Sequence, residues 1–340
     1  MPDPVLPIID AHTHLAGLGH GGTGCFIDAR KFETLLYKMM RWKLGIYDAH
    51  RQQRLDQAYL ERLERDVGEA RDHGALHAAL VFAHERIYTE SGDVMERGQE
   101  LYVPNEYAFQ CCENAKGKFL PAASVHPYRK DALDEVAKWI ERGAAALKWL
   151  PNSQGMDPQD KRCFPLYDLL VKKNVPLIVH TGGEHTVSVI RPELGDPKMM
   201  IPALERGVVV IMAHCGTKSG IFDGHWMPDF CALARKYPNC WGDTSAFCTP
   251  GRTRWIARIL REEGVVEKLI HGSDYPVPPG AYENLLALGW SRVRALAKIW
   301  SFLERDVSIK RARGFPDAVF TNAARILAPG SVKRWVGEPT

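Results

Sequence analysis

Short apolar segments rich in β-branched residues recur along the chain and alternate with longer stretches of helical periodicity. The eight segments begin at Val5, Leu76, Phe119, Ala145, Val175, Val208, Cys240 and Lys268. In the stretch between the first two segments, one helical face is formed by Leu55, Tyr59, Leu63, Val67 and Ala70. This alternation is typical of parallel βα units, so the sequence predicts an α/β fold.

Eight parallel strands can form either a closed barrel or a doubly wound open sheet. Polar residues cluster at the carboxyl end of nearly every predicted strand, which is where the active site of a (β/α)₈ barrel forms. An open sheet would need a glycine-rich phosphate turn that opens a helix, and the glycine-rich stretch 17–24 lacks that helix. We therefore expect residues 1–340 to form one (β/α)₈ TIM barrel domain, with 17–24 as a mobile loop over the site.

The segment between the first and second strands, about residues 15–74, is too long for a simple crossover and carries two helical patterns. We expect a helical insertion here that acts as a lid or cap. One of its patterns is a stripe formed by Phe32, Leu35, Leu36, Met39 and Met40. Such stripes usually pack in a core, so packing against the barrel is the favoured interpretation of these side chains. A lid or cap whose apolar side chains pack against the barrel would satisfy both interpretations.

Charge and hydropathy exclude several classes of protein. The chain has 44 lysine and arginine residues against 41 acidic residues, without a basic run, so no nucleic acid partner is expected.

The longest apolar runs, such as 208–213, are far shorter than the roughly 20 residues that span a bilayer, so no membrane segment is expected. The first residues do not resemble a signal peptide, which makes a cytoplasmic protein the expectation. The eight cysteines lack a C-x-x-C pair, which favours free buried thiols.

Histidines and carboxylates gather at the predicted mouth of the barrel. Asp10, His12 and His14 alternate along the first strand, so their side chains should point to the same side, into the barrel. The groups expected at the mouth are His12, His14, His180, His214 and Asp274, from the first, fifth, sixth and eighth strands. Zinc favours nitrogen donors with a carboxylate, and a catalytic site leaves one position for water. The sequence thus predicts a divalent metal centre.

These motifs resemble the amidohydrolase superfamily, and more closely its branch of amidohydrolase-related TIM-barrel enzymes that includes aminocarboxymuconate semialdehyde decarboxylase. The resemblance covers nearly the whole chain and rests on DAHTH at 10–14, the histidines of the fifth and sixth strands, GSDYP at 272–276 and NAARIL at 322–327. It implies that His12, His14 and His180 bind the metal. It further implies that His214 binds a second metal or orients the reacting group, and that Asp274 binds metal and moves protons.

Other residues near the strand ends are further candidates. Lys148 lies where some relatives carry a carboxylated lysine that bridges two metals, but a structural or substrate-contacting lysine is favoured. Trp149, His84 and His126 are candidates for substrate contact, although loop hydrogen bonding is the favoured role of the two histidines. Asp243 and Ser245 could orient the metal ligands. Strand alternation predicts that His271 packs outward, away from Asp274.

The leading functional hypothesis is hydrolysis of a small amide, lactone or ester by metal-activated water, with Asp274 and His214 as catalytic residues. The alternative is nonoxidative decarboxylation of an unsaturated or aromatic acid, which needs a cation aimed at the substrate carboxylate. Candidates for that cation are Arg51, Arg54, Arg129 and Arg162. A catalytically inactive barrel that acts as a binding protein is a third hypothesis, against which the intact ligand set argues.

The expected cofactor is one or two divalent ions, with zinc favoured and manganese as the alternative. The expected partner is a small-molecule substrate. Homo-oligomeric association is also an expectation, because symmetric assembly is common for barrels of this kind.

Overall fold

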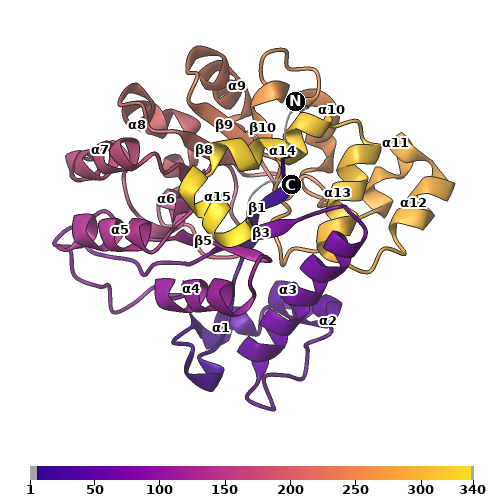
Figure 1. The fold of residues 1–340 in the computed structure, drawn as a ribbon, viewed down its shortest axis with the longest axis horizontal. Helices are drawn as coiled ribbons and strands as arrows, with labels where there is room; N and C mark the ends of the chain where they lie inside the picture. The colour runs from indigo at the N-terminus through magenta and orange to yellow at the C-terminus, as the bar shows by residue number, and fades with distance from the viewer. Residues whose placement is uncertain (1–5, 338–340) are drawn as a thin grey trace.

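The computed structural model describes residues 6–337, and a sheet of eight parallel strands lies at its centre (Figure 1). The strands, in their order around the sheet, are β1 (Ile9–His14), β3 (Ala78–Phe82), β5 (Phe119–Ala123), β6 (Ala146–Trp149), β7 (Leu177–His180), β8 (Val210–Ala213), β9 (Cys240–Asp243) and β10 (Leu269–Ile270). Each lies within one of the eight predicted segments, so the barrel prediction is confirmed. Val5, where the first segment begins, is outside the described residues.

Backbone hydrogen bonds between the first and last strands bring the sheet close to a full barrel. Ala11 N donates to the His271 carbonyl at 2.9 Å, and His14 N donates to the Tyr275 carbonyl at 2.8 Å. Asp274 N donates to the His12 carbonyl at 2.9 Å. Because β10 is short, this contact with β1 continues through the loop that follows it, and Asp274 is thereby fixed beside His12.

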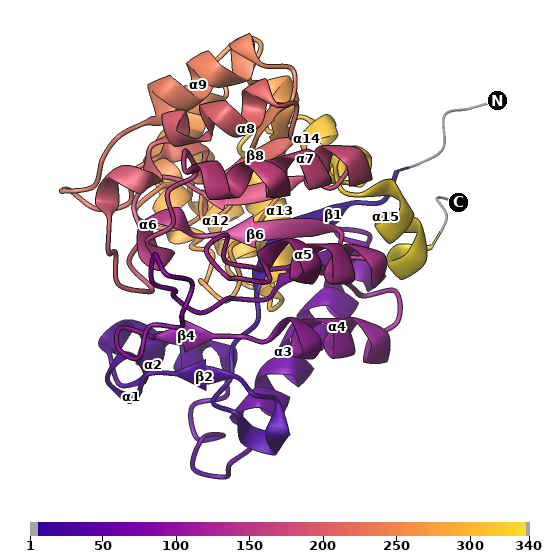
Figure 2. The same ribbon diagram turned by 90° about the vertical axis from the view of Figure 1, so that its left-hand side faces the viewer.

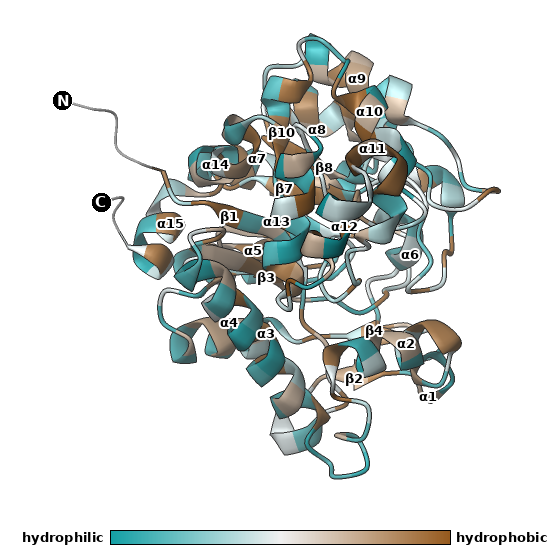
Figure 3. Ribbon diagram, turned by 90° about the vertical axis from the view of Figure 1, so that its right-hand side faces the viewer, coloured by the Kyte–Doolittle hydropathy of each residue, from teal (hydrophilic) through white to brown (hydrophobic). Residues whose placement is uncertain are grey.

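The helices mostly surround the barrel, and the longer ones bury an apolar face. They are α1 (Ala29–Phe32), α2 (Leu35–Leu44), α3 (Leu55–Asp72), α4 (Asn105–Asn114), α5 (Ala132–Glu141), α6 (Pro151–Gln154), α7 (Phe164–Lys173), α8 (Ile201–Glu205), α9 (Met227–Lys236), α10 (Ile256–Ile259), α11 (Leu285–Leu288), α12 (Trp290–Leu296), α13 (Phe302–Ala312), α14 (Asp317–Ile326) and α15 (Pro329–Val336). The periodicity predicted for α3 is real, because Leu63, Val67 and Ala70 are fully buried. Figure 3 shows hydrophilic residues on the outer helices and hydrophobic residues along the strands.

The chain between β1 and α3 stands apart from the ring of helices (Figure 2). It contains α1, α2 and the strand β2 (Phe26–Ile27), which pairs antiparallel with β4 (Leu101–Tyr102). In the stripe predicted for this segment, Phe32 and Met40 are buried, but Leu35 is 84% exposed and Met39 is 40% exposed. Core packing therefore accounts for only part of the stripe.

The glycine-rich loop at 17–24 is tied to the start of α3. Leu18 N donates to the Asp56 carboxylate at 2.8 Å and Gly19 N at 3.0 Å, and the Thr23 hydroxyl donates to the same group at 2.5 Å. Asp56 is fully buried, so it serves as the internal anchor of this loop.

Helix α15 lies at the other end of the barrel, near the starts of the strands (Figure 2). Ala328 N donates to the Ala145 carbonyl at 3.0 Å, just before β6. All eight cysteines are buried and free, as predicted. Among the described residues, none of the helices combines the length and apolar character that crossing a membrane requires.

Candidate metal centre and active site

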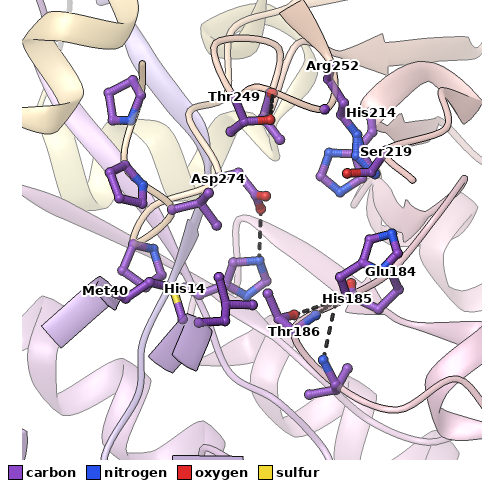
Figure 4. A pocket seen from close by; sticks show the side chains of 18 of the residues that line it. His14, Met40, Glu184, His185, Thr186, His214, Ser219, Thr249, Arg252 and Asp274 are labelled. Carbon is purple, nitrogen blue, oxygen red and sulfur yellow. Dashed lines mark hydrogen bonds and ion pairs between the residues drawn. The ribbon is translucent and has the colours of Figure 1, made fainter. Parts of the chain in front are cut away.

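Three of the predicted groups meet at the carboxyl end of the barrel. His12 Nε2 lies 3.1 Å from His14 Nε2, and an Asp274 carboxylate oxygen lies 3.2 Å from the first of these atoms and 3.3 Å from the second. Figure 4 shows Asp274 directed towards His14. Asp274 has a φ of 71°, in the left-handed region that non-glycine residues seldom adopt. The left-handed backbone of Asp274, in the loop after β10, thus places its carboxylate over β1.

Hydrogen bonds on the far side of each imidazole set which nitrogen faces the site. His12 Nδ1 lies 2.7 Å from an Asp243 carboxylate oxygen, and His214 Nδ1 lies 2.8 Å from Ser245 Oγ and 3.1 Å from the Ser245 carbonyl. The other Asp243 oxygen accepts from the backbone N of His214 at 2.9 Å and of Ser245 at 3.0 Å. With Nδ1 as the donor in both rings, each Nε2 keeps a free lone pair. Asp243 and Ser245 therefore have the orienting positions that the sequence suggested for them.

His180, at the end of β7, reaches the same region. Its ring centroid lies 4.9 Å from that of His214, and its Nε2 is buried without a hydrogen-bond partner. Its Nδ1 lies 3.5 Å from the carboxylate of Glu184, which sequence reasoning missed. Burial, only partly offset by Glu184, lowers the pKa of His180 to about 4, so this ring is neutral near pH 7. A neutral ring with an unsatisfied nitrogen is suited to bind a metal.

The donor set fits a divalent cation. Ligand atoms of His12, His214 and Asp274 lie within 4.8 Å of one another, and His14 adds a further nitrogen to them. Burial acts to raise the pKa of Asp274, but His214, His12 and His14 outweigh it and hold this pKa well below the usual range. The site therefore combines a carboxylate that stays ionised with several imidazoles, which are donors that zinc and manganese both accept.

Lys148 lies on β6, beneath the site. Its ammonium nitrogen has no hydrogen-bond partner among the described residues, is almost fully buried and lies 4.7 Å from the centre of the Phe82 ring. Burial lowers the pKa of Lys148 to about 8. The residue does not line the large cavity described below.

The remaining predicted residues lie at different distances from the site. His84 lines the cavity, and burial lowers its pKa to about 3. His126 Nδ1 accepts from Tyr128 N at 3.1 Å, and its Nε2 lies 3.2 Å from the Gln154 carbonyl, so both ring nitrogens are engaged in loop contacts. Trp149 donates from Nε1 to the Val125 carbonyl at 2.8 Å and does not line the cavity.

Two residues beside the ligands face the outside of the barrel or its seam. His271 packs against Phe320 of α14, which agrees with its predicted outward orientation. Asp10 was expected to point into the barrel with His12, but one of its carboxylate oxygens lies 3.7 Å from Nε2 of the outward-packed His271. The other oxygen accepts from His12 N at 3.0 Å and Ser273 N at 2.9 Å. The pairing of β1 is irregular between Asp10 and Thr13, which breaks the simple alternation of side chains.

A cavity of about 440 Å³ opens over the metal centre, and Arg252 lies in its wall (Figure 4). Arg252 is 3% exposed, donates from Nη2 to the Gly183 carbonyl at 2.6 Å and has no partner for Nε in the described part of the chain. The four arginines proposed from the sequence do not line this cavity. Two of them are held elsewhere: Arg129 pairs with Glu85 and Asp131, and Arg162 pairs with Asp160.

A sequence model of the amidohydrolase family matches residues 9–298. No curated protein matches the chain. The fold is similar to that of an uncharacterised TIM-barrel protein from Bordetella bronchiseptica, with a TM-score of 0.60, 15% identity and coverage of 97% of this chain and 98% of the other. A putative 2-pyrone-4,6-dicarboxylic acid hydrolase from Pseudomonas putida has a similar fold, with a TM-score of 0.50, 14% identity and coverage of 98% of both chains. IDCase from Metarhizium anisopliae also matches, with a TM-score of 0.50, 12% identity and coverage of 97% of both chains.

Proposed function

Because this chain belongs to the amidohydrolase family, we propose that it is a metal-dependent hydrolase that cleaves a small organic amide, lactone or ester. The observation that carries the proposal is the position of Asp274, whose carboxylate lies 3.2 Å from His12 Nε2 and 3.3 Å from His14 Nε2 at the base of a cavity. A carboxylate that is kept ionised at such a place can accept a proton from an attacking water molecule.

His12, His14, His180 and Asp274 would hold the metal, with His214 able to bind a second ion or to complete the first site. A bound divalent cation supplies Lewis acidity, which polarises a carbonyl and lowers the pKa of a water to about 7. Zinc is the proposed ion, with manganese as the alternative, because imidazole and carboxylate ligands suit both.

In the proposed reaction Asp274 first removes a proton from the attacking water and then donates it to the leaving nitrogen or oxygen. The bond from water oxygen to the carbonyl carbon forms, and the bond from that carbon to the leaving atom breaks. His214 donates from Nδ1 towards Ser245, so its Nε2 faces the site as an acceptor. This arrangement favours a ligand role for His214 over donation of a hydrogen bond to the substrate.

Decarboxylation is the second candidate, and Arg252 favours it. A buried guanidinium with an unpartnered Nε in the cavity wall is a binding group for a substrate carboxylate. In this reaction Asp274 takes a proton from water and passes it to the carbon that bears the carboxyl group, the bond between the two carbons breaks, and carbon dioxide leaves.

Isotope incorporation distinguishes the two reactions. We would incubate the metal-loaded protein with aryl esters, lactones and anilides, and separately with substituted benzoic acids, in ¹⁸O water and in D₂O. Hydrolysis places ¹⁸O in a product acid, whereas decarboxylation places deuterium on carbon and releases carbon dioxide. Asp274→Asn should abolish either product, and His126→Ala is the matched control, since His126 lies outside the cavity. Failure of both panels with a fully metal-loaded protein would oppose the proposal.

A further inference from the structure

The cavity over the metal centre has two chemically different ends. Many of its polar groups lie near the strand ends, among them His14, His180, His214, Asp274 and Arg252. Three further charged side chains, Lys43, Glu283 and Arg305, line other parts of the wall. Much of the remaining wall is apolar and comes from three places: α2, the loop after β10, and single side chains of other segments. The apolar side chains are Leu15, Leu36, Met39, Met40, Leu101, Leu150, Val187, Pro276, Val277, Pro278 and Pro279.

The α2 part of this wall is one face of the helix. Leu36, Met39, Met40 and Lys43 follow helical spacing and line the cavity together with Tyr37, whereas Leu35 does not line it and is 84% exposed. Figure 4 shows Met40 and Arg252 on opposite sides of the cavity, with Asp274 between them. A ligand that reaches from Arg252 past Asp274 would therefore meet the apolar face of α2.

Hydrogen bonds hold this wall in place against the barrel loops. The Tyr37 hydroxyl donates to the Thr186 carbonyl at 3.3 Å, which links α2 to the loop after β7. Next to it, the Glu100 carboxylate accepts from Ser188 N at 2.6 Å and from the Ser188 hydroxyl at 2.7 Å. The apolar face of α2 is thus a built part of the cavity. Its methionines are flexible enough to follow the shape of an apolar ligand.

The size of the cavity agrees with a ligand larger than the reacting group alone. A volume of about 440 Å³ lies in the range of pockets that hold cofactor-sized or drug-sized molecules. An apolar wall of this extent gains most free energy when it covers alkyl or aryl surface, because each buried methylene contributes about 0.8 kcal/mol.

We propose that the cavity binds a substrate with an extended alkyl or aryl chain, which packs against α2 and the proline-rich loop at 276–279 while its anionic end contacts Arg252. The position of the reacting carbon beside Asp274 rests on the proposed function. The chain subsite itself rests on the cavity wall alone. Lys43, at the end of the same helical face, would lie where the chain approaches solvent.

The test is a chain-length series of linear carboxylates, from butanoate to octanoate, titrated calorimetrically into the metal-loaded full-length protein. We expect Kd to fall by about fourfold for each added methylene, which is 0.8 kcal/mol converted at 1.4 kcal/mol per tenfold. Met39→Ser should weaken octanoate by about fourfold or more and leave butanoate nearly unchanged. Leu35→Ser is the matched control on the solvent side of the same helix and should leave the whole series unchanged.

Two outcomes would overturn the inference: affinity that does not depend on chain length, or equal effects of Met39→Ser and Leu35→Ser. Either would leave the proposed function intact, because turnover of the isotope panels is measured independently. The subsite would be supported, even if neither reaction were observed, by a Kd that falls steeply with chain length and that depends less on chain length in Met39→Ser but not in Leu35→Ser.

Discussion

The ammonium group of Lys310, on α13 outside the barrel, donates a hydrogen bond of 2.6 Å to the carbonyl oxygen of Gly272. Lys310 is fully buried and forms an ion pair with the buried carboxylate of Asp306. Gly272 lies two residues before Asp274, and the intervening Ser273 N donates to the Asp10 carboxylate at 2.9 Å. The left-handed conformation of Asp274 is therefore supported by charged groups behind the site.

Lys310→Met should destabilise the protein and displace Asp274. The substitution leaves the Asp306 carboxylate buried without its cation, which typically costs about 3–5 kcal/mol. The double variant Lys310→Met with Asp306→Leu removes both charges and should recover most of the free energy of unfolding, measured by urea denaturation. Because the hydrogen bond to Gly272 stays lost, kcat should remain low while KM changes little. Full activity of the double variant would show that Lys310 does not position Asp274.

His12→Ala should remove the metal. The substitution deletes one of the ring nitrogens that converge with Asp274, and it removes the imidazole that pairs with one of the two Asp243 carboxylate oxygens. We expect about one zinc or manganese per chain in the unmodified protein and little in the variant, measured by plasma mass spectrometry without chelators. His126→Ala is the control and should retain the metal. A content near two ions would instead favour Lys148 as a bridging ligand, and no metal after reconstitution would contradict the assigned centre.

The barrel and its histidines were predictable because both depend on local patterns. Strand ends carry the ligands, and parallel strands place their ends on one side of a barrel, so His12, His180 and Asp274 could be brought together from the sequence. Glu184 was missed because it lies in the irregular loop after β7, and only the course of that loop brings its carboxylate to His180. Arg252 was missed because it lies in a loop, and only tertiary packing brings its side chain into the cavity. Asp10 departed from expectation because an irregularity in β1 interrupts the alternation.

Arg252→Met should weaken the binding of carboxylates. The guanidinium is buried and oriented by the Gly183 carbonyl, so its loss removes a charge-assisted contact from the cavity wall. We expect the Kd of benzoate to rise by about tenfold or more, since hydrogen bonds to charged groups contribute about 1.5–3 kcal/mol. Arg252→Lys should restore only part of the affinity, because an ammonium cannot form a paired contact. Arg162→Met, whose arginine pairs with Asp160, is the control. Unchanged benzoate binding in Arg252→Met would remove the main support for decarboxylation.

Lys148→Met should stabilise the metal-free protein at neutral pH. Burial lowers the pKa of Lys148 from its ordinary 10.5 to about 8, so below pH 8 the folded and unfolded chains both carry the charge and folding bears its full burial cost. Between pH 8 and 10.5 the unfolded chain binds more protons than the folded one, and the free energy of unfolding rises with pH. The variant lacks this cost and should be more stable by up to ~3 kcal/mol at pH 7, an advantage that disappears above pH 10.5. Urea denaturation of both proteins at pH 7 and pH 10.5 measures the difference. Equal stability at pH 7 would mean that Lys148 is not a buried cation, and would favour a carboxylated side chain.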